Sequence, residues 1–136
     1  MAADTAIIRR LQQVGGQGEI RLEITSHAIR SLTNDVAKYA AEAKTEAEAV
    51  FERYGQLMYE EAFRLCPEDT GNLRASITLL VEELGYLIFT DVTYAAYVEY
   101  GTSRAAAQPF MLPAFQRYKD DLYRDLHAVL VKARGA

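Results

Sequence analysis

The fold is decided by residues 57–91, which read LMYEEAFRLCPEDTGNLRASITLLVEELGYLIFTD. Up to Leu65 the apolar residues recur at spacings of three and four, which is the pattern of one buried helix face. Pro67 ends this pattern, because the residue before a proline disfavours the α region. Beyond Ser76 the apolar residues tend to alternate, which is the pattern of a half-buried strand. The stretch therefore predicts a helix that is followed closely by strands.

The helix extends towards the N-terminus to about Thr33, where the side chain of Asn34 or Asp35 can cap the free N–H groups. Its predicted inner face consists of Val36, Ala40, Ala43, Ala47, Val50, Tyr54, Leu57, Met58, Ala62 and Leu65. About 30 residues at a rise of 1.5 Å give a rod of roughly 45 Å, which is long for so small a domain. Two interpretations stay open: a core helix only, or a core helix that also contacts neighbouring subunits.

Three strands are predicted. The first is residues 19–25, whose apolar residues alternate with others: Ile20, Leu22 and Ile24. Segments 76–84 and 86–91 are rich in β-branched and aromatic residues, so they predict a hairpin around Gly85. The alternating apolar residues of this hairpin are Ile77, Leu79 and Val81 on one strand and Tyr86 and Ile88 on the other.

The C-terminal part predicts two more helices. Residues 93–100 read as a short helix with Thr93 as its N-cap and Gly101 as its terminator. A small, flexible loop at Ser103–Gln108 follows, and Pro113 suits the first turn of a last helix. The predicted buried face of that helix is Phe115, Tyr118, Leu122, Leu126 and Val129.

The predicted fold class is α+β, with a small, mainly antiparallel sheet packed against one long helix and a C-terminal helix. We divide the chain into a flexible N-terminal arm, residues 1–18, and a single α+β domain, residues 19–136. The arm holds an apolar and basic stretch, Ala6–Leu11, that can form one or two helical turns. Three glycines then interrupt it: Gly15, Gly16 and Gly18.

Composition narrows the class of function. The 136 residues suit one domain with its own core. One cysteine and two distant histidines, His27 and His127, predict no disulfide framework, no metal site and no cofactor. A net charge of −4 argues against general nucleic-acid binding, and no apolar run approaches the roughly 20 residues of a membrane span. Because the N-terminus lacks a signal-peptide layout, we expect synthesis in the cytoplasm and no membrane partner.

Asp69-Thr70-Gly71 is the tripeptide of aspartic proteases, in which two such aspartates share a proton. Here it follows a long helix instead of a strand, so we favour a structural role. In that role Asp69 or Thr70 caps a turn at residues 72–74, and Gly71 allows a close approach. Cys66 is expected to be a small buried hydrophobe, because the sequence places no base beside it.

The carboxylates predict no catalytic residue. Glu82 and Glu83 are adjacent on a strand and so point to opposite faces, and neither Asp91 nor Glu99 completes a pair. A second acidic group shares a helix face with Lys119 and Arg124 and reads as solvated surface: Asp120, Asp121 and Asp125.

Tyrosine is the more informative residue type, with nine copies against no tryptophan. Six lie in the C-terminal half: Tyr86, Tyr94, Tyr97, Tyr100, Tyr118 and Tyr123. Tyrosine buries a large area and still forms a hydrogen bond at its tip, so it is enriched in interfaces. We expect some of the six in the core and the others at subunit contacts.

Three blocks of sequence resemble the signature of one protein family. Residues 66–77, CPEDTGNLRASI, are similar to its pattern of proline, an acidic residue and Thr-Gly-x-Leu-Arg-x-Ser-Ile. Residues 97–102, YVEYGT, resemble its Tyr-x-Val-Glu-x-Gly-Thr block, and residues 108–115, QPFMLPAF, its Gln-Pro-Phe block. In this order and spacing, over roughly residues 36–132, they resemble the neck or tail-completion (minor tail component) family of long-tailed bacteriophages and gene-transfer-agent-like particles.

This resemblance implies a structural virion protein and not an enzyme. Such proteins form a homo-oligomeric ring, commonly a hexamer, in the virion neck or tail. The ring joins head-closure or connector proteins to the tail tube or tail terminator, and DNA passes through its channel without sequence-specific binding. A closed ring joins two different faces of each subunit, which the long helix and a sheet edge can supply.

The residues that this resemblance assigns to structural motifs and subunit contacts are Pro67, Asp69, Thr70, Gly71, Leu73, Arg74, Ser76, Tyr97, Glu99, Gly101, Thr102, Pro109, Phe110 and Pro113. Among them, Arg74 and Glu99 are candidates for a charge pair within or between subunits. Two alternatives stay open: a small dimeric adaptor unrelated to phage, with the long helix as its interface, and, more remotely, an aspartic-type hydrolase.

Overall fold

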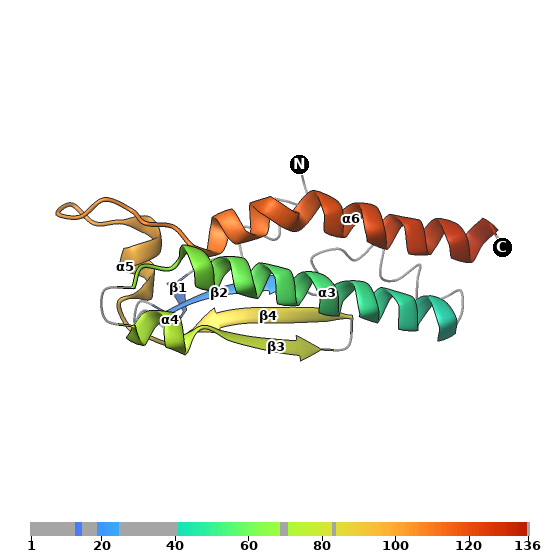
Figure 1. The fold of residues 1–136 in the computed structure, drawn as a ribbon, viewed down its shortest axis with the longest axis horizontal. Helices are drawn as coiled ribbons and strands as arrows, with labels where there is room; N and C mark the ends of the chain where they lie inside the picture. The colour runs from blue at the N-terminus through green and yellow to red at the C-terminus, as the bar shows by residue number, and fades with distance from the viewer. Residues whose placement is uncertain (1–12, 15–18, 25–40, 69–70, 83, 136) are drawn as a thin grey trace.

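The computed structural model describes residues 13–14, 19–24, 41–68, 71–82 and 84–135. The elements in chain order are β1 (Gln13–Val14), β2 (Glu19–Ile24), α3 (Ala41–Leu65), α4 (Asn72–Ser76), β3 (Thr78–Glu82), β4 (Gly85–Thr90), α5 (Ala95–Tyr100) and α6 (Met111–Gly135). The strands form one antiparallel sheet in the order β1-β2-β4-β3. Two long helices lie beside this sheet (Figure 1), so the predicted α+β class is confirmed.

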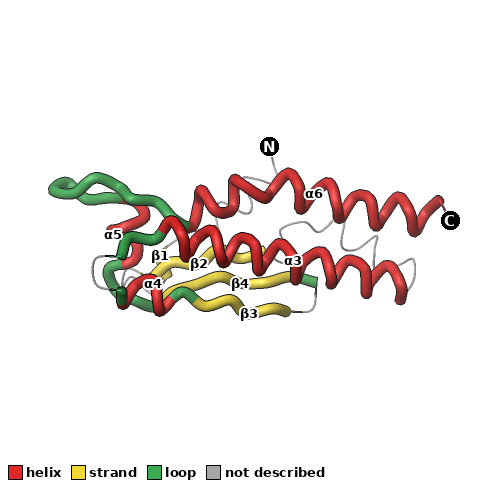
Figure 2. The backbone as a smooth tube through the Cα atoms, viewed as in Figure 1, coloured by secondary structure: helices red, strands yellow, loops and turns green. Residues whose placement is uncertain are grey.

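Both long helices cover one face of the sheet. Helix α3 packs against β3 and β4, and α6 packs along α3 and reaches β2. The two helices run in opposite directions (Figure 2). Most of the largest buried side chains in the core come from four elements: Phe51 and Met58 of α3, Tyr86 and Ile88 of β4, Leu22 of β2, and Phe115 and Leu122 of α6.

The predicted inner face of the long helix is confirmed within the described residues. Ala43, Ala47, Val50, Tyr54, Met58 and Ala62 are buried, and Leu57 and Leu65 are half-buried. The helix ends at Leu65, two residues before Pro67, as predicted. Its predicted beginning, with Val36, Ala40 and the caps Asn34 and Asp35, lies outside the described residues.

The predicted hairpin forms, but its turn differs from the prediction. Gly85 is the first residue of β4 and pairs with Glu82, so it does not make the turn. Leu84, which lies in the connection, has a positive φ of 55°. Val81 pairs with the buried Tyr86 and so lies on the same face of the sheet, but it is 49% exposed because β3 is the outermost strand.

One of the predicted helix caps can be compared with the structure. Gly71 is the N-cap residue of α4, whereas the candidate caps Asp69 and Thr70 lie outside the described residues. A Cβ at Gly71 would meet nothing within 4 Å, so its φ of 73° is what favours glycine, not a close approach. For α5 the prediction is wrong, because Tyr94, not Thr93, is the N-cap. Gly101 does end α5, with φ 78°.

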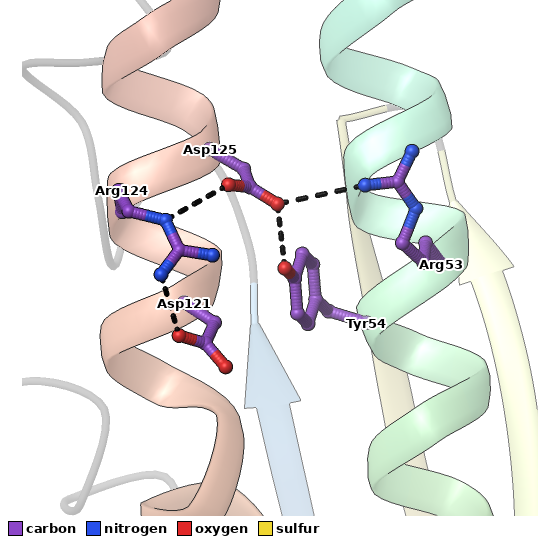
Figure 3. A network of polar contacts seen from close by, with 5 residues as sticks. All are labelled: Arg53, Tyr54, Asp121, Arg124 and Asp125. Atoms are coloured by element: carbon purple, nitrogen blue, oxygen red, sulfur yellow. Dashed lines mark hydrogen bonds and ion pairs between the residues drawn. The ribbon is translucent and has the colours of Figure 1, made fainter.

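A polar network joins the two long helices (Figure 3). The Tyr54 hydroxyl donates to Asp125 at 2.5 Å, and Arg53 lies 3.5 Å from the same carboxylate. Arg124 bridges Asp125 and Asp121 along α6. The hydrogen bond from Tyr54 is the main reason why the pKa of Asp125 is lowered. The prediction of plain solvated surface is therefore wrong for Asp125, which is half-buried and faces α3.

Glu61 makes a second link between these helices, which the sequence analysis missed. Arg64 donates to both of its oxygens, at 2.9 and 2.7 Å, and Arg117 of α6 donates at 3.2 Å. The hydrogen bond from Arg64 lowers the pKa of Glu61. The carboxylate is buried but fully paired, which is how a charge is tolerated at such a position.

The N-terminal boundary holds one further difference. Gln13 and Val14, which the sequence analysis placed in the arm, pair with Ile20 and Glu19 as β1. The predicted helical turns at Ala6–Leu11 lie outside the described residues. Within the part of the chain that the structure describes, no helix is both long and apolar enough to cross a membrane.

Candidate functional site

The three sequence blocks meet at one end of the molecule. They line a pocket of about 190 Å³ between α5 and the loop that follows it. We call this the α5 pocket; its walls are mainly apolar. Pro67 comes from the first block, Tyr97, Val98 and Thr102 from the second, and Gln108 from the third; Tyr94, Ala105 and Ala106 complete the lining.

Glu99 fixes α5 against the start of α6. Its Oε1 accepts hydrogen bonds from the backbone N–H groups of Phe110 and Met111, at 3.0 and 2.9 Å, and Oε2 accepts one from Leu112 at 3.1 Å. The first N–H groups of a helix have no partner within it, and an anion there also interacts favourably with the helix dipole. Since α6 has no acidic residue in its own first turn, the buried Glu99 serves as its cap.

Arg74 holds the other side of the site together. It donates to the Glu68 carboxylate at 2.6 Å and to the Cys66 carbonyl oxygen at 2.9 Å, and its guanidinium lies 5.1 Å from the centre of the Phe63 ring. Arg74 and Glu99 therefore do not form the expected charge pair within one subunit, and that prediction is wrong. It does not suit a contact between subunits either, because Glu99 is only 3% exposed and its oxygens face α6.

The loop of residues 102–109 projects from the end of the molecule beside α5 (Figure 1). All of its residues are exposed. The Thr102 hydroxyl accepts hydrogen bonds from the N–H groups of Arg104 and Ala105, and the Gln108 N–H donates to the Val98 carbonyl oxygen at 2.8 Å. These bonds give the loop a defined turn at its base and tip.

Most of the predicted site residues support this end of the molecule from inside. Leu73 and Phe110 are buried in the core. The Ser76 hydroxyl is hydrogen-bonded to that of Thr90 at 2.5 Å, which ties α4 to β4. Pro113 lies in the first turn of α6, as predicted, and Pro109 is exposed at the end of the loop. Asp69 and Thr70 lie outside the described residues.

Three of the six tyrosines pack in or against the core, as predicted, and the subunit contacts expected of the others stay a prediction. Tyr86 is fully buried, and Tyr118 and Tyr123 are half-buried against the core. Tyr94, Tyr97 and Tyr100 are exposed, Tyr97 most of all at 56%. Tyr94 and Tyr97 line the α5 pocket, so this end offers an aromatic surface of the kind that is enriched in interfaces.

Cys66 is buried, as predicted, and burial raises the pKa of its thiol to about 11. A protonated, enclosed thiol is a poor nucleophile. Among the described residues, no group of three histidine, cysteine, aspartate or glutamate side chains could hold a metal ion.

One further exposed surface lies on β3 and was not predicted from the sequence. Leu80 and Val81 of β3 are 50% and 49% exposed. The signal was present, because Leu79, Leu80 and Val81 are consecutive apolar residues, and neighbouring residues of a strand point to opposite faces. At least one of the three therefore had to lie on the outer face of the sheet.

Comparison with known families identifies the family of this chain. Residues 30–101 match the family described as "Bacteriophage HK97-gp10, putative tail-component". The chain belongs to this family of phage tail components, which places it in the virion. The match includes the first sequence block and the second block up to Gly101, and it stops before the third. No curated protein and no solved structure matches the chain.

Proposed function

We propose that this protein forms a closed homo-oligomeric ring, a hexamer, at the head–tail junction of the virion. The ring joins head-closure or connector proteins to the tail tube or tail terminator and leaves an axial channel for DNA. Membership in a tail-component family is the observation that carries this proposal. The finer position, in the neck, rests on the resemblance of the three sequence blocks to neck and tail-completion proteins.

The distribution of exposed apolar side chains supports assembly by two different faces. Of the described residues, the large apolar side chains that are exposed lie mainly on β3 (Leu80, Val81) and around α5 (Tyr94, Tyr97, Tyr100), with Phe63 and Val131 as the other two. A ring of identical copies needs two unlike, complementary surfaces on each subunit.

The exposed side of α3 favours a ring over a dimer built on the long helix. Among residues 43–65 of this helix, the exposed residues apart from Phe63 are polar or small: Thr45, Ala49, Glu52, Arg53, Gln56, Glu60 and Arg64. A stable dimer interface is usually rich in apolar contacts, so this helix face suits solvent. The dimeric adaptor would instead need this surface as its main contact.

The charge of the chain suits a DNA channel without specific binding. A protein that grips DNA neutralises phosphates with many Lys and Arg side chains. With a net charge of −4, this chain would let DNA slide through the ring.

Native mass spectrometry of the purified protein across a concentration series tests the ring. A hexamer or similar closed assembly is expected, whereas a stable dimer would favour the adaptor. Detection of the protein in purified virions, with immunogold labelling at the head–tail junction, tests its position. Label along the whole tail tube, or none on virions, would contradict the neck assignment.

We further propose that the N-terminal arm docks onto an adjacent ring. The motivation is its apolar residues Ile7, Ile8 and Leu11 beside Arg9 and Arg10. Because Gln13 and Val14 pair with β2, the truncation that tests this removes only residues 1–12. Normal yields of joined particles from the truncated protein would refute the role.

A further inference from the structure

We infer that the α5 pocket receives Leu80 from the β3 edge of a second copy of this chain. This inference rests on the proposed ring and names its contact. Of the two faces expected from the sequence, the long helix is replaced by α5 and the loop of residues 102–109, and the sheet edge is kept.

The β3 edge has the properties of a surface that a partner covers. As the outermost strand, β3 has one side without a paired strand in the described sheet. Such edges are usually blunted by charge, proline or a covering element, since they pair readily with other chains. Here the strand carries Leu80 and Val81 at about half exposure. On the face of Leu80, the half-buried residues Leu87 and Phe89 of β4 extend the apolar surface.

The α5 pocket has complementary properties. It is mainly apolar and is open beside the exposed Tyr97. Its volume of about 190 Å³ suits an aliphatic side chain and leaves no room for a second element. The loop that forms one wall projects beyond the body of the molecule (Figure 1), so it can reach along the edge of a neighbouring sheet.

The charges beside the two surfaces are opposite. Arg104 directly precedes Ala105, which lines the pocket, and Glu82 lies two residues after Leu80 and so on the same face of β3. With Leu80 in the pocket, Glu82 lies about 7 Å further along that face, within reach of the long Arg104 side chain. Both residues are exposed, and neither takes part in an ion pair among the described residues.

The two surfaces lie at different places on the molecule. Figure 1 shows α5 and the loop at one end, while β3 runs along the border of the sheet away from α6. A contact between unlike faces of identical copies is head-to-tail, and it closes into a ring when the rotation between copies divides a full turn. Contact between two β3 edges would instead give a twofold dimer.

Cysteine cross-linking of full-length protein tests the contact directly. Ala106→Cys and Leu80→Cys are made as separate variants and then mixed under mild oxidation. A disulfide-linked dimer is expected only in the mixture. Val81→Cys is the matched control, because it has the same exposure on the same strand but points to the other face. Native Cys66 is buried and does not interfere.

Two outcomes of this experiment overturn the inference. Cross-linking of Leu80→Cys with itself would show that two β3 edges meet. Equal cross-linking of Leu80→Cys and Val81→Cys to Ala106→Cys would show that the contact has no preferred face.

Assembly of charged variants supplies the second test. Tyr97→Glu and Leu80→Glu should each raise the concentration needed for assembly roughly tenfold or more, which corresponds to about 1.4 kcal/mol. Mixing the two should give a one-to-one dimer, since each variant keeps one intact face. Val131→Glu, at 52% exposure on α6, is the control and should assemble like the wild type. Circular dichroism confirms that each variant is folded.

The outcomes separate this inference from the proposed ring. A wild-type ring that persists in Tyr97→Glu and Leu80→Glu would overturn the α5 pocket contact but leave the ring standing. A wild-type protein that stays monomeric at every concentration would overturn both. Rescue of assembly in an Arg104→Glu and Glu82→Arg double variant, with loss in each single variant, would support the pairing of Arg104 with Glu82 across the contact.

Discussion

Replacing Glu99 by glutamine should loosen the junction between α5 and α6. The carboxylate accepts three backbone N–H groups at the start of α6 while only 3% exposed. The side-chain oxygen of a glutamine can still accept hydrogen bonds from the N–H groups of Phe110 and Met111, but the glutamine NH₂ group then faces the N–H of Leu112. One charge-assisted hydrogen bond, worth about 1.5–3 kcal/mol, is lost. Loss of the interaction with the helix dipole adds about 0.3–1 kcal/mol, so we expect Glu99→Gln to lower the free energy of unfolding by about 2–4 kcal/mol.

Urea denaturation measures this loss as a lower midpoint with an unchanged slope. Hydrogen exchange should show that the amides of residues 110–112 lose protection. Glu60→Gln is the matched control, because Glu60 is an exposed carboxylate on α3; its effect should stay within about 0.5 kcal/mol. If both variants are equally stable, Glu99 does not hold α6. If Glu99→Gln is more stable than the wild type, burying the charge costs more free energy than its hydrogen bonds contribute.

Three further predictions follow from local geometry. Gly101→Ala should destabilise the protein more than Gly71→Ala in urea denaturation: both have positive φ, which costs about 1–2 kcal/mol, but only at Gly101 would a Cβ come within 2.7 Å of backbone nitrogen. Equal losses would show that the loop moves aside freely. The hydrogen bond from Tyr54 lowers the pKa of Asp125 in the folded state. This bond therefore stabilises the folded protein at pH values above the ordinary pKa of an aspartate, and the stabilisation is lost as the pH falls through the lowered pKa of the folded state. Tyr54→Phe should therefore cost about 1 kcal/mol near pH 7 and flatten the fall in stability below about pH 4, and an unchanged slope would contradict this. Cys66 is buried, and the pKa of its thiol is raised to about 11. Near pH 8 its reaction with a thiol-specific disulfide reagent should therefore be limited by the rate at which the protein unfolds around it. Reaction rates measured at increasing urea concentrations would show this as a rise that follows unfolding.

The long helix shows which structural features local periodicity is sufficient to predict. Its inner face from Ala43 to Ala62 followed from spacing alone, because a helix that borders a core must repeat its apolar residues every three or four positions. Its end followed from Pro67, whose ring restricts the residue before it. Tertiary contacts decided which polar residues of the helices face inward. Asp125 and Glu61 look like surface residues in sequence, yet each finds partners on the opposite helix.

The turns and caps depended on the path of the chain. Thr93 is a good capping residue by type, but α5 begins one residue later, with Tyr94 as its N-cap and no side chain as a cap. Gly85 reads as a turn residue, yet it pairs with Glu82, and Leu84 adopts the positive φ instead. At turns and helix ends, the conformational propensity of a residue type amounts to a preference of only about 1 kcal/mol. The packing energy of the neighbouring helices and strands easily exceeds this preference.

The sequence by itself determined the α+β class, the two long helices, the hairpin and the family resemblance, because these depend on periodicity and on short motifs read along the chain. Only the tertiary structure decided that Pro67, Tyr97 and Gln108 line one pocket and that Glu99 caps α6 instead of meeting Arg74. The tertiary structure also decided that β3 is an exposed edge strand of the sheet. The physical reason is that contacts between residues far apart in the chain depend on how whole elements pack, and no local pattern records that packing.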